Sequence, residues 1–482
     1  MRLGSAVADA VASWRMSDEV PAPKTPPRAG SLKAIFVNMG WLLGGRGVAA
    51  ILSLLYIAVI TRTLGLDGFG QFSLVGGVAH TITALVSFQT WQVIVRYGMG
   101  HLHEDRPNAL ARLIKACLAL DVGAALLGSL LAWAAVTLLG PRFGWSAELQ
   151  RDALFFCFVS LVAVRSTSVG ILRLYDRFGI AALADTAMPV SRLAGAFIAL
   201  AVAPNVRGFL IAWAAAEIIA AAAFWVFAAG TIRNLPWRTS RLSRALVRAD
   251  NPGIVRLAGI TNASQTFQLA SRQVAVLLVG LFASPAAAGG FRLAHQLGQA
   301  MAKVGQLLAR ALFPELMRAR TLSADPDHFR QLLSRTVSIA AGAGAAIFAL
   351  LYFAGEWLLG VVAGAEFVAV YPLLLLLGAA AIIDLIGVGF EPALIAAGRA
   401  GTAFRIQLFV AVTLVTLLVV LLSRHGAIGG GIALLIGSAL GFGLLAAATR
   451  RSFRRSDPPV TPTDAVIVEG DRADVDRPET LG

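Results

Sequence analysis

The amino-acid sequence predicts an all-α, polytopic membrane protein of about twelve transmembrane helices. Hydrophobic residues make up 57% of its 482 residues and charged residues only 14%, whereas soluble domains are about 45–50% apolar and about 25% charged. Backbone polar groups in lipid must be paired internally, which leaves helix bundles and closed barrels. Runs such as PLLLLLGAAAII lack the polar–apolar alternation of barrel strands. A helix bundle is therefore expected.

Twelve apolar segments have the roughly 17–25 residues that a membrane-spanning helix needs. They lie near residues 35–60, 72–94, 116–139, 152–172, 179–203, 208–230, 254–282, 288–312, 332–355, 368–391, 403–423 and 427–448. The segments predict a disordered cytoplasmic N-terminal tail, a six-helix bundle, a basic cytoplasmic connector, a second six-helix bundle and a disordered cytoplasmic C-terminal tail. Their expected bounds are 1–33, 34–230, 231–253, 254–449 and 450–482.

The distribution of positive charge predicts the orientation, because cytoplasmic loops retain Lys and Arg. Of the 41 Lys and Arg residues, 30 lie in the two tails and in alternate connectors, counting the span ends beside them, five lie in the opposite connectors, and six lie deeper inside predicted spans. Both termini are therefore expected in the cytoplasm, with the chain in a bacterial inner membrane. The net charge of +14 lies mostly at the membrane edge, so we expect membrane lipids as partners and no nucleic acid.

The two halves also resemble each other weakly. Two short segments repeat at a shift of 219 residues: Gly70, Phe72 and Leu74, and Gly289, Phe291 and Leu293. Each set opens the second helix of its half. Because six helices separate the copies, the sequence predicts two parallel six-helix repeats, an architecture found in transporters.

Six cations inside the predicted spans need partners or water, since each costs about 2.5–3.5 kcal/mol at mid-bilayer. They are Arg46, Arg165, Arg192, Arg272, Arg292 and Lys303. One interpretation is a cavity that accepts phosphate or acidic sugars, because guanidinium groups match phosphate oxygens. The other is internal ion pairing, which is favoured for Arg165, Arg192, Asp121, Asp185 and Glu217.

Three predicted helices carry a polar face. The strongest is a stripe with helical spacing, Arg292, Gln296, Gln299, Lys303, Gln306 and Arg310. The others are Thr261, Gln265, Gln268 and Arg272, and His80, Thr83, Ser87 and Thr90. Such faces can line a cavity between the repeats, although Gln side chains also join helices together.

We predict substrate binding by Arg46, Arg272, Arg292, Lys303, Gln299, Gln268 and His80. Asp384 and Glu391 stand seven residues apart and would share a helix face, where they bind a coupling ion or neutralise arginines. No GxxxxGK[ST] motif and no zinc-ligand spacing occurs. The sequence therefore predicts no catalytic residues, no metal and no cofactor.

Three segments resemble the polysaccharide-exporting, Wzx-type branch of the multidrug/oligosaccharidyl-lipid/polysaccharide exporter superfamily. They are RTLGLDGFGQFSL (Arg62–Leu74), FPEL before a basic connector, and LLGVVAGAEFVAVYPLLLLLG. The likeness covers about residues 34–448. It implies a V-shaped pair of six-helix bundles around a central cavity and a flippase, not an enzyme. The substrate would be a lipid-linked oligosaccharide, and the partners would be a polysaccharide polymerase and glycosyltransferases.

Three alternatives stay open. A cation-coupled multidrug exporter of the same superfamily would need fewer cavity cations, and Arg272, Arg292 and Lys303 speak against it. A peptidoglycan-precursor flippase usually has more than twelve helices. A membrane-embedded glycan ligase or polymerase is disfavoured by the short predicted external loops.

Overall fold

The computed structural model describes residues 32–300, 326–396 and 399–454. The chain divides into two compact units, Met1–Val48 and Ala49–Gly482. Helices dominate the described residues, and no strand occurs among them. The predicted all-α class is confirmed.

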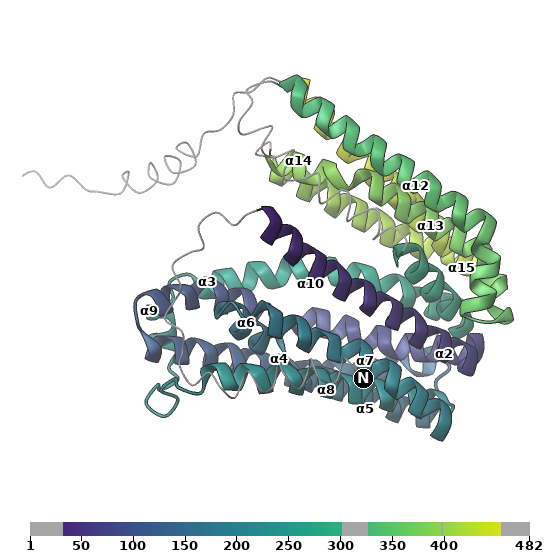
Figure 1. Ribbon diagram of the computed structural model, residues 1–482. Helices are drawn as coiled ribbons and strands as arrows, with labels where there is room; N and C mark the ends of the chain where they lie inside the picture. Colours follow the sequence, from purple (N-terminus) through teal and green to yellow (C-terminus); the bar gives the residue numbers. More distant parts are fainter. Residues whose placement is uncertain (1–31, 301–325, 397–398, 455–482) are drawn as a thin grey trace, which may run out of the picture. The chain divides into compact units, whose positions relative to one another are not determined.

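The first half of the chain contains seven labelled helices (Figure 1). They are α2 (Leu32–Val86), α3 (Thr90–His103), α4 (Pro107–Leu139), α5 (Ala147–Val162), α6 (Ser166–Leu174), α7 (Phe178–Val202) and α8 (Val206–Ile232). A short 3₁₀ helix, η1 (Pro141–Phe143), joins α4 to α5. Helix α7 packs against α8, α4 against α5, and α3 against α6.

The connector and the second half follow. They contain α9 (Arg244–Asp250), α10 (Ile254–Phe282), a helix over 285–300, α12 (Pro326–Val362), η2 (Ala365–Val370), α13 (Tyr371–Ile386), η3 (Gly387–Gly389), α14 (Phe390–Ala396) and α15 (Ala400–Arg454). Helix α13 packs against α12 and α15.

Eight helical spans among the described residues are long and apolar enough to cross a membrane. Helices α2 and α15 have 55 residues each, more than twice the roughly 20 residues of one crossing. Each is interrupted by a non-helical glycine, Gly65 at φ 64° and Gly426 at φ 57°. Positive φ suits glycine because it has no Cβ. Each of the two helices therefore accounts for two predicted spans, and every predicted span overlaps a described helix.

Two predicted spans, 72–94 and 152–172, are each interrupted by a short non-helical segment that the sequence does not predict. Residues 87–89 separate α2 from α3, and residues 163–165 separate α5 from α6. Hydroxyl residues stand at both restarts, Thr90 at the first and Ser166 and Thr167 at the second. The N-cap residues, Gln89 and Arg165, make no side-chain cap hydrogen bond, so these starts do not depend on side-chain caps.

The breaks coincide with a division of the hydrophobic core. A large cluster contains Phe72, Phe156 and Trp213, and a second cluster contains Ile94, Leu113, Ile171 and further apolar residues of α3, α4 and α6. Helix α4 runs through both, with Ala124 and Ala125 in the first and Leu110 and Cys117 in the second. The two cysteines, Cys117 and Cys157, are free and lie in different clusters.

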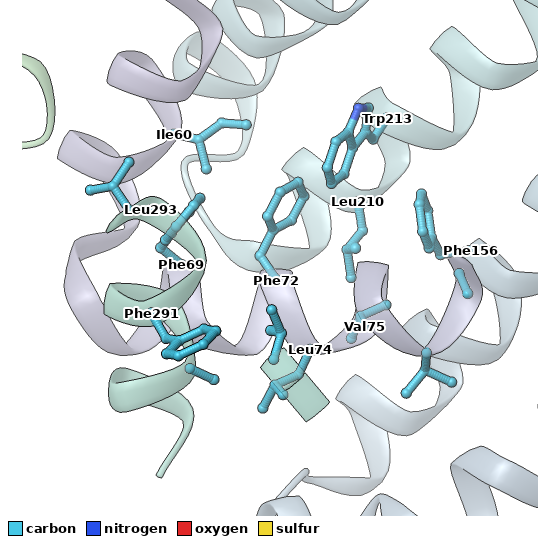
Figure 2. Packing of buried hydrophobic residues seen from close by; sticks show 14 of the residues in the cluster. Ile60, Phe69, Phe72, Leu74, Val75, Phe156, Leu210, Trp213, Phe291 and Leu293 are labelled. Atoms are coloured by element: carbon cyan, nitrogen blue, oxygen red, sulfur yellow. The ribbon is translucent and has the colours of Figure 1, made fainter. Parts of the chain in front are cut away.

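Repeat-equivalent residues meet where α2 crosses the 285–300 helix. A Cβ atom on Gly70 would lie 1.8 Å from the Pro285 carbonyl oxygen, and one on Gly289 would lie 2.8 Å from the Gly70 nitrogen. Both glycines are therefore required for this close approach. Figure 2 shows Phe291 and Leu293 beside Phe69 and Leu74 in the same cluster.

The turn at Gly65 contacts the segment that precedes α13. Leu66 N donates to Glu366 Oε2 at 3.2 Å, and Arg62 Nη2 donates to the Val361 carbonyl. Residues about 300 positions apart are thereby joined at the ends of their helices.

Candidate functional site

A cavity of about 200 Å³ lies at the level of the two helix breaks. Its polar lining comes from His80, Thr83 and Ser87 on or just after α2, Asp121 on α4, Ser160, Arg165 and Ser166 at the α5–α6 break, and Glu217 on α8. The predicted polar face of the second span thus lies on a cavity wall. Substrate binding by His80 stays a prediction.

Glu217 connects two of the intramembrane arginines. Its Oε1 accepts a hydrogen bond from Arg192 Nη2 at 2.8 Å, and its Oε2 lies 3.3 Å from Arg165 Nη2. The Glu217 side chain is only 8% exposed, while that of Arg165 is 39% exposed on the cavity wall. The predicted internal ion pairing is confirmed for these three residues.

Trp213 lies at the centre of an aromatic and cationic cluster. The Phe72 ring stacks on it at 4.4 Å between centroids, as Figure 2 shows. The Arg192 guanidinium carbon lies 4.4 Å from the indole centroid and that of Arg292 lies 5.8 Å from it. Cations are attracted to the face of an indole. Because Trp213 and Glu217 are four residues apart on α8, one helix face presents both groups to the arginines.

Arg292 and His80 belong to the same neighbourhood. Arg292 Nη1 donates to the Ser73 carbonyl at 3.1 Å, and His80 Nδ1 donates to Gly76 O at 2.6 Å within its own helix. The His80 and Trp213 ring centroids are 6.4 Å apart. Arg165, Arg192 and Arg292 therefore gather around one carboxylate and one indole. Three positive charges and one negative charge leave a net charge of +2.

Several polar atoms of this region are buried without a hydrogen-bond partner among the described residues. They are Ser73 Oγ, Ser160 Oγ, Arg192 Nε and Trp213 Nε1. An unpaired buried donor costs about 1–3 kcal/mol. The cluster is thus built to accept further hydrogen-bond partners, from water or from a ligand.

Asp121 makes a different contact from the one predicted. It accepts hydrogen bonds from the hydroxyl groups of Thr90 and Thr167 and from the Thr167 amide, and it forms no ion pair within the described part of the chain. The expectation of an ion pair at Asp121 is wrong. The two threonines lie in the first turns of α3 and α6, and their hydroxyl groups occupy the carboxylate in place of a cation.

The remaining predicted site residues are distributed along the second half. Gln299 is half-buried on the 285–300 helix. Arg46, Gln268 and Arg272 stand on α2 and α10, but their side chains, like all of Lys303, lie outside the described residues. Their roles stay predictions.

Asp384 and Glu391 do not share one continuous α-helix. Asp384 is exposed on α13, and Glu391 lies in the first turn of α14. The 3₁₀ helix Gly387–Gly389 separates them. Glycine is a poor helix former, and two of them within three residues explain the interruption. The two acids therefore do not lie on one uninterrupted α-helix, and both their shared face and ion coupling by this pair stay predictions.

Comparison with known proteins places the chain in a family. A family model described as "Polysaccharide biosynthesis protein" matches residues 35–320. The inner membrane protein YghQ of Escherichia coli (strain K12) is 27% identical over 348 residues, which cover 72% of this chain and 97% of that protein.

Two solved structures share the fold. A multidrug resistance MATE family transporter of the MOP superfamily, in an inward-facing conformation, has a TM-score of 0.61 and 14% identity, over 84% of this chain and 96% of that one. The lipid II flippase MurJ, in an inward closed conformation, has a TM-score of 0.63 and 13% identity, over 90% and 93%. At these identities the likeness concerns the fold.

The predicted all-α, multi-pass fold is confirmed, and it is shared with these two transporters. The family model covers more than half of the 482 residues. The chain belongs to the polysaccharide biosynthesis protein family.

Proposed function

We propose that the protein is a flippase that carries a polyprenyl-diphosphate-linked oligosaccharide across the bacterial inner membrane by alternating access. Both termini would lie in the cytoplasm, as the loop charges predict. Glycosyltransferases would supply the substrate, and a polymerase would use the product in cell-surface polysaccharide biosynthesis. Membership of the polysaccharide biosynthesis family supports the substrate class.

The observation that carries the proposal is the excess of arginine over carboxylate around Trp213. Arg165 and Arg192 share Glu217, while Arg292 contacts a backbone carbonyl and the indole. Even when Asp121 on the same cavity wall is counted, positive charge remains in excess, which is costly inside a transmembrane bundle unless an anion compensates it. A diphosphate carries oxygens that guanidinium groups bind in pairs. A cationic drug would raise the cost further.

Arg292 provides the test, because among the described residues its contacts include no carboxylate that its removal would leave unpaired. Purified protein would be reconstituted in liposomes with a fluorescent polyprenyl-diphosphate oligosaccharide. We expect Arg292→Gln to slow translocation by roughly tenfold or more, the effect of losing one charge-assisted contact. Arg292→Lys should retain part of the rate because the charge stays.

Arg207 serves as the control. Its side chain is 70% exposed, and its partner Asp152 lies 3.5 Å away, so Arg207→Gln should translocate like the wild type. Normal translocation by Arg292→Gln would refute the proposed role of the cluster. Export of cationic dyes without any glycan-lipid translocation would favour the multidrug exporter instead.

A further inference from the structure

The two helix breaks in the first half contact each other directly. Ser166 Oγ donates to the Phe88 carbonyl at 3.4 Å and accepts from Trp91 N at 3.3 Å. The start of α3 is thereby linked to the start of α6. Discontinuous helices at mid-membrane depth are a feature of transporter binding sites.

Asp121 joins both restarts to α4. Thr90 Oγ1 lies 3.1 Å from each carboxylate oxygen. Thr167 donates to Oδ2 twice, from Oγ1 at 2.6 Å and from its amide at 3.2 Å. Asp121 is only 4% exposed, and every one of these donors is uncharged. A carboxylate can accept all of these hydrogen bonds at once, since it has about four lone-pair positions.

Among the residues that the structure describes, no cation forms an ion pair with Asp121. Cys117 lies one turn earlier on α4, and the cavity wall also carries His80, Arg165 and Glu217. Arg165 is engaged by Glu217, and His80 donates to its own helix. The cavity of about 200 Å³ has room for several waters, because a water occupies about 30 Å³ in the liquid. Water can therefore bring protons to the carboxylate.

We propose that Asp121 is a proton-binding site whose occupancy controls the attachment of the first turns of α3 and α6 to α4. The inference rests on the proposed transport function but not on the identity of the cargo. A hydronium ion transfers its proton to one carboxylate oxygen and leaves as water. The protonated oxygen then becomes a donor, so at least one threonine hydroxyl must turn away. The Thr167 amide also loses its charged acceptor, and charge-assisted hydrogen bonds are the stronger ones.

The packing limits how far protonation can act. Helices α3 and α6 are in close contact, since a Cβ atom on Gly170 would lie 2.8 Å from the Trp91 Cα. Their apolar side chains share the second hydrophobic cluster with Leu113 and other residues of α4, so both helices stay packed on α4. Protonation of Asp121 would therefore loosen only the first turns of α3 and α6, next to residues 87–89 and 163–165.

Infrared difference spectroscopy of the purified full chain in lipid nanodiscs tests proton binding without any cargo. The wild type should show a protonated-carboxyl band that grows between neutral and acidic buffer, and Asp121→Asn should remove one component of this band. Asp152→Asn is the matched control, because Asp152 is an acid near the start of α5 beside the exposed Arg207, and it should keep the band. A difference spectrum of Asp121→Asn that superimposes on the wild type overturns the proposal.

Hydrogen exchange tests the loosening of these first turns. After correction for the intrinsic pH dependence, amides of residues 90–93 and 166–170 should exchange about tenfold faster in acid in the wild type, the size expected for one charge-assisted hydrogen bond. Asp121→Asn should abolish this pH dependence. If Asp121→Asn does not fold, Thr167→Val serves instead: it removes one donor to the charged form, so the carboxyl band should appear at higher pH. An unchanged band and pH-independent exchange in the wild type would also overturn the proposal.

A transport measurement separates this proposal from the proposed function. In proteoliposomes an imposed proton gradient should accelerate glycan-lipid translocation by the wild type but not by Asp121→Asn. If no glycan lipid moves under any condition while the band and the exchange behave as expected, the flippase assignment fails and the proton site stands. If translocation proceeds but neither the band nor the gradient depends on Asp121, the proton site fails alone.

Discussion

Glu217 compensates two arginines that come from different parts of the chain. The sequence predicts this pairing, because opposite intramembrane charges need each other. The sequence does not predict the role of Trp213, since a tryptophan in an Ala-rich span is equally suited to packing or to the membrane interface. Its contact with Arg192 depends on how α7 packs against α8, and its contact with Phe72 depends on α2.

Replacing Glu217 should therefore harm folding. Glu217→Gln leaves Arg192, whose side chain is 17% exposed, without its carboxylate. Breaking a buried ion pair in this way costs about 3–5 kcal/mol, with a smaller share from the more exposed Arg165. We expect a lower unfolding temperature and lower membrane abundance.

The surface pair of Asp152 and Arg207 is the comparison for this variant. Asp152→Asn should change stability little, because exposed ion pairs contribute about 0–1 kcal/mol. The double variant Glu217→Gln, Arg192→Gln should recover part of the lost abundance, since it removes one of the orphaned charges. Wild-type stability of Glu217→Gln would contradict the ion-pair geometry.

At the scale of helices, the apolar spans are predictable and their interruptions are not. The length of a span follows from bilayer thickness, so a span can be recognised directly from the length of an apolar run in the sequence. The breaks at 87–89 and 163–165 depend on Asp121, which lies 31 residues from Thr90 and 46 from Thr167. Only packing brings these groups together. The contact between α2 and the 285–300 helix is predicted in part, because the sequence repeat singles out Gly70 and Gly289 but does not show that they touch.

Adding a methyl group at the crossing should force α2 and the 285–300 helix apart. In Gly70→Ala the new Cβ meets backbone atoms of Pro285, which cannot turn aside as a side chain can. We expect a large loss of thermal stability and abundance. Gly123→Ala on α4 is the matched control, since nothing lies within 4 Å of its Cβ position. It should be neutral or stabilising by up to about 1 kcal/mol. Equal behaviour of the two variants would argue against the crossing.

At the scale of the whole molecule, the sequence predicts the number and order of spans but not their conformational state. The bundle bounds and the cytoplasmic termini stay predictions. Reporter fusions test them: a fusion after Arg248 should report the cytoplasm, and fusions near Gly144, Ser284 and Gly364 should report the opposite side, because the latter connectors are poor in Lys and Arg. A cytoplasmic signal at Ser284 would break the twelve-helix topology.

The contact between Leu66 and Glu366 tests alternating access. Cysteines at these two positions should be joined by a short, reducible bis-methanethiosulfonate crosslinker, since the Glu366 side chain reaches Leu66 N at 3.2 Å. If the turn at Gly65 separates from the segment before α13 during each cycle, the crosslink should stop translocation and a reductant should restore it. The native Cys117 and Cys157 are buried and leave little background. Full translocation by the crosslinked protein would mean that this contact does not open.

The glycine crossing also bears on the ancestry of the chain. In a two-fold symmetric dimer, the residues on the axis meet their own copies, and here Gly70 meets its copy Gly289. Two separate half-length chains would form the same contact, with identical neighbours on both sides. The fused chain does not have that restriction. Position 73 is a serine and its copy at 292 is an arginine, and this arginine donates to the serine's own carbonyl. Fusion thus permitted a single cation to be placed beside the axis, where an unfused pair would hold two arginines or none.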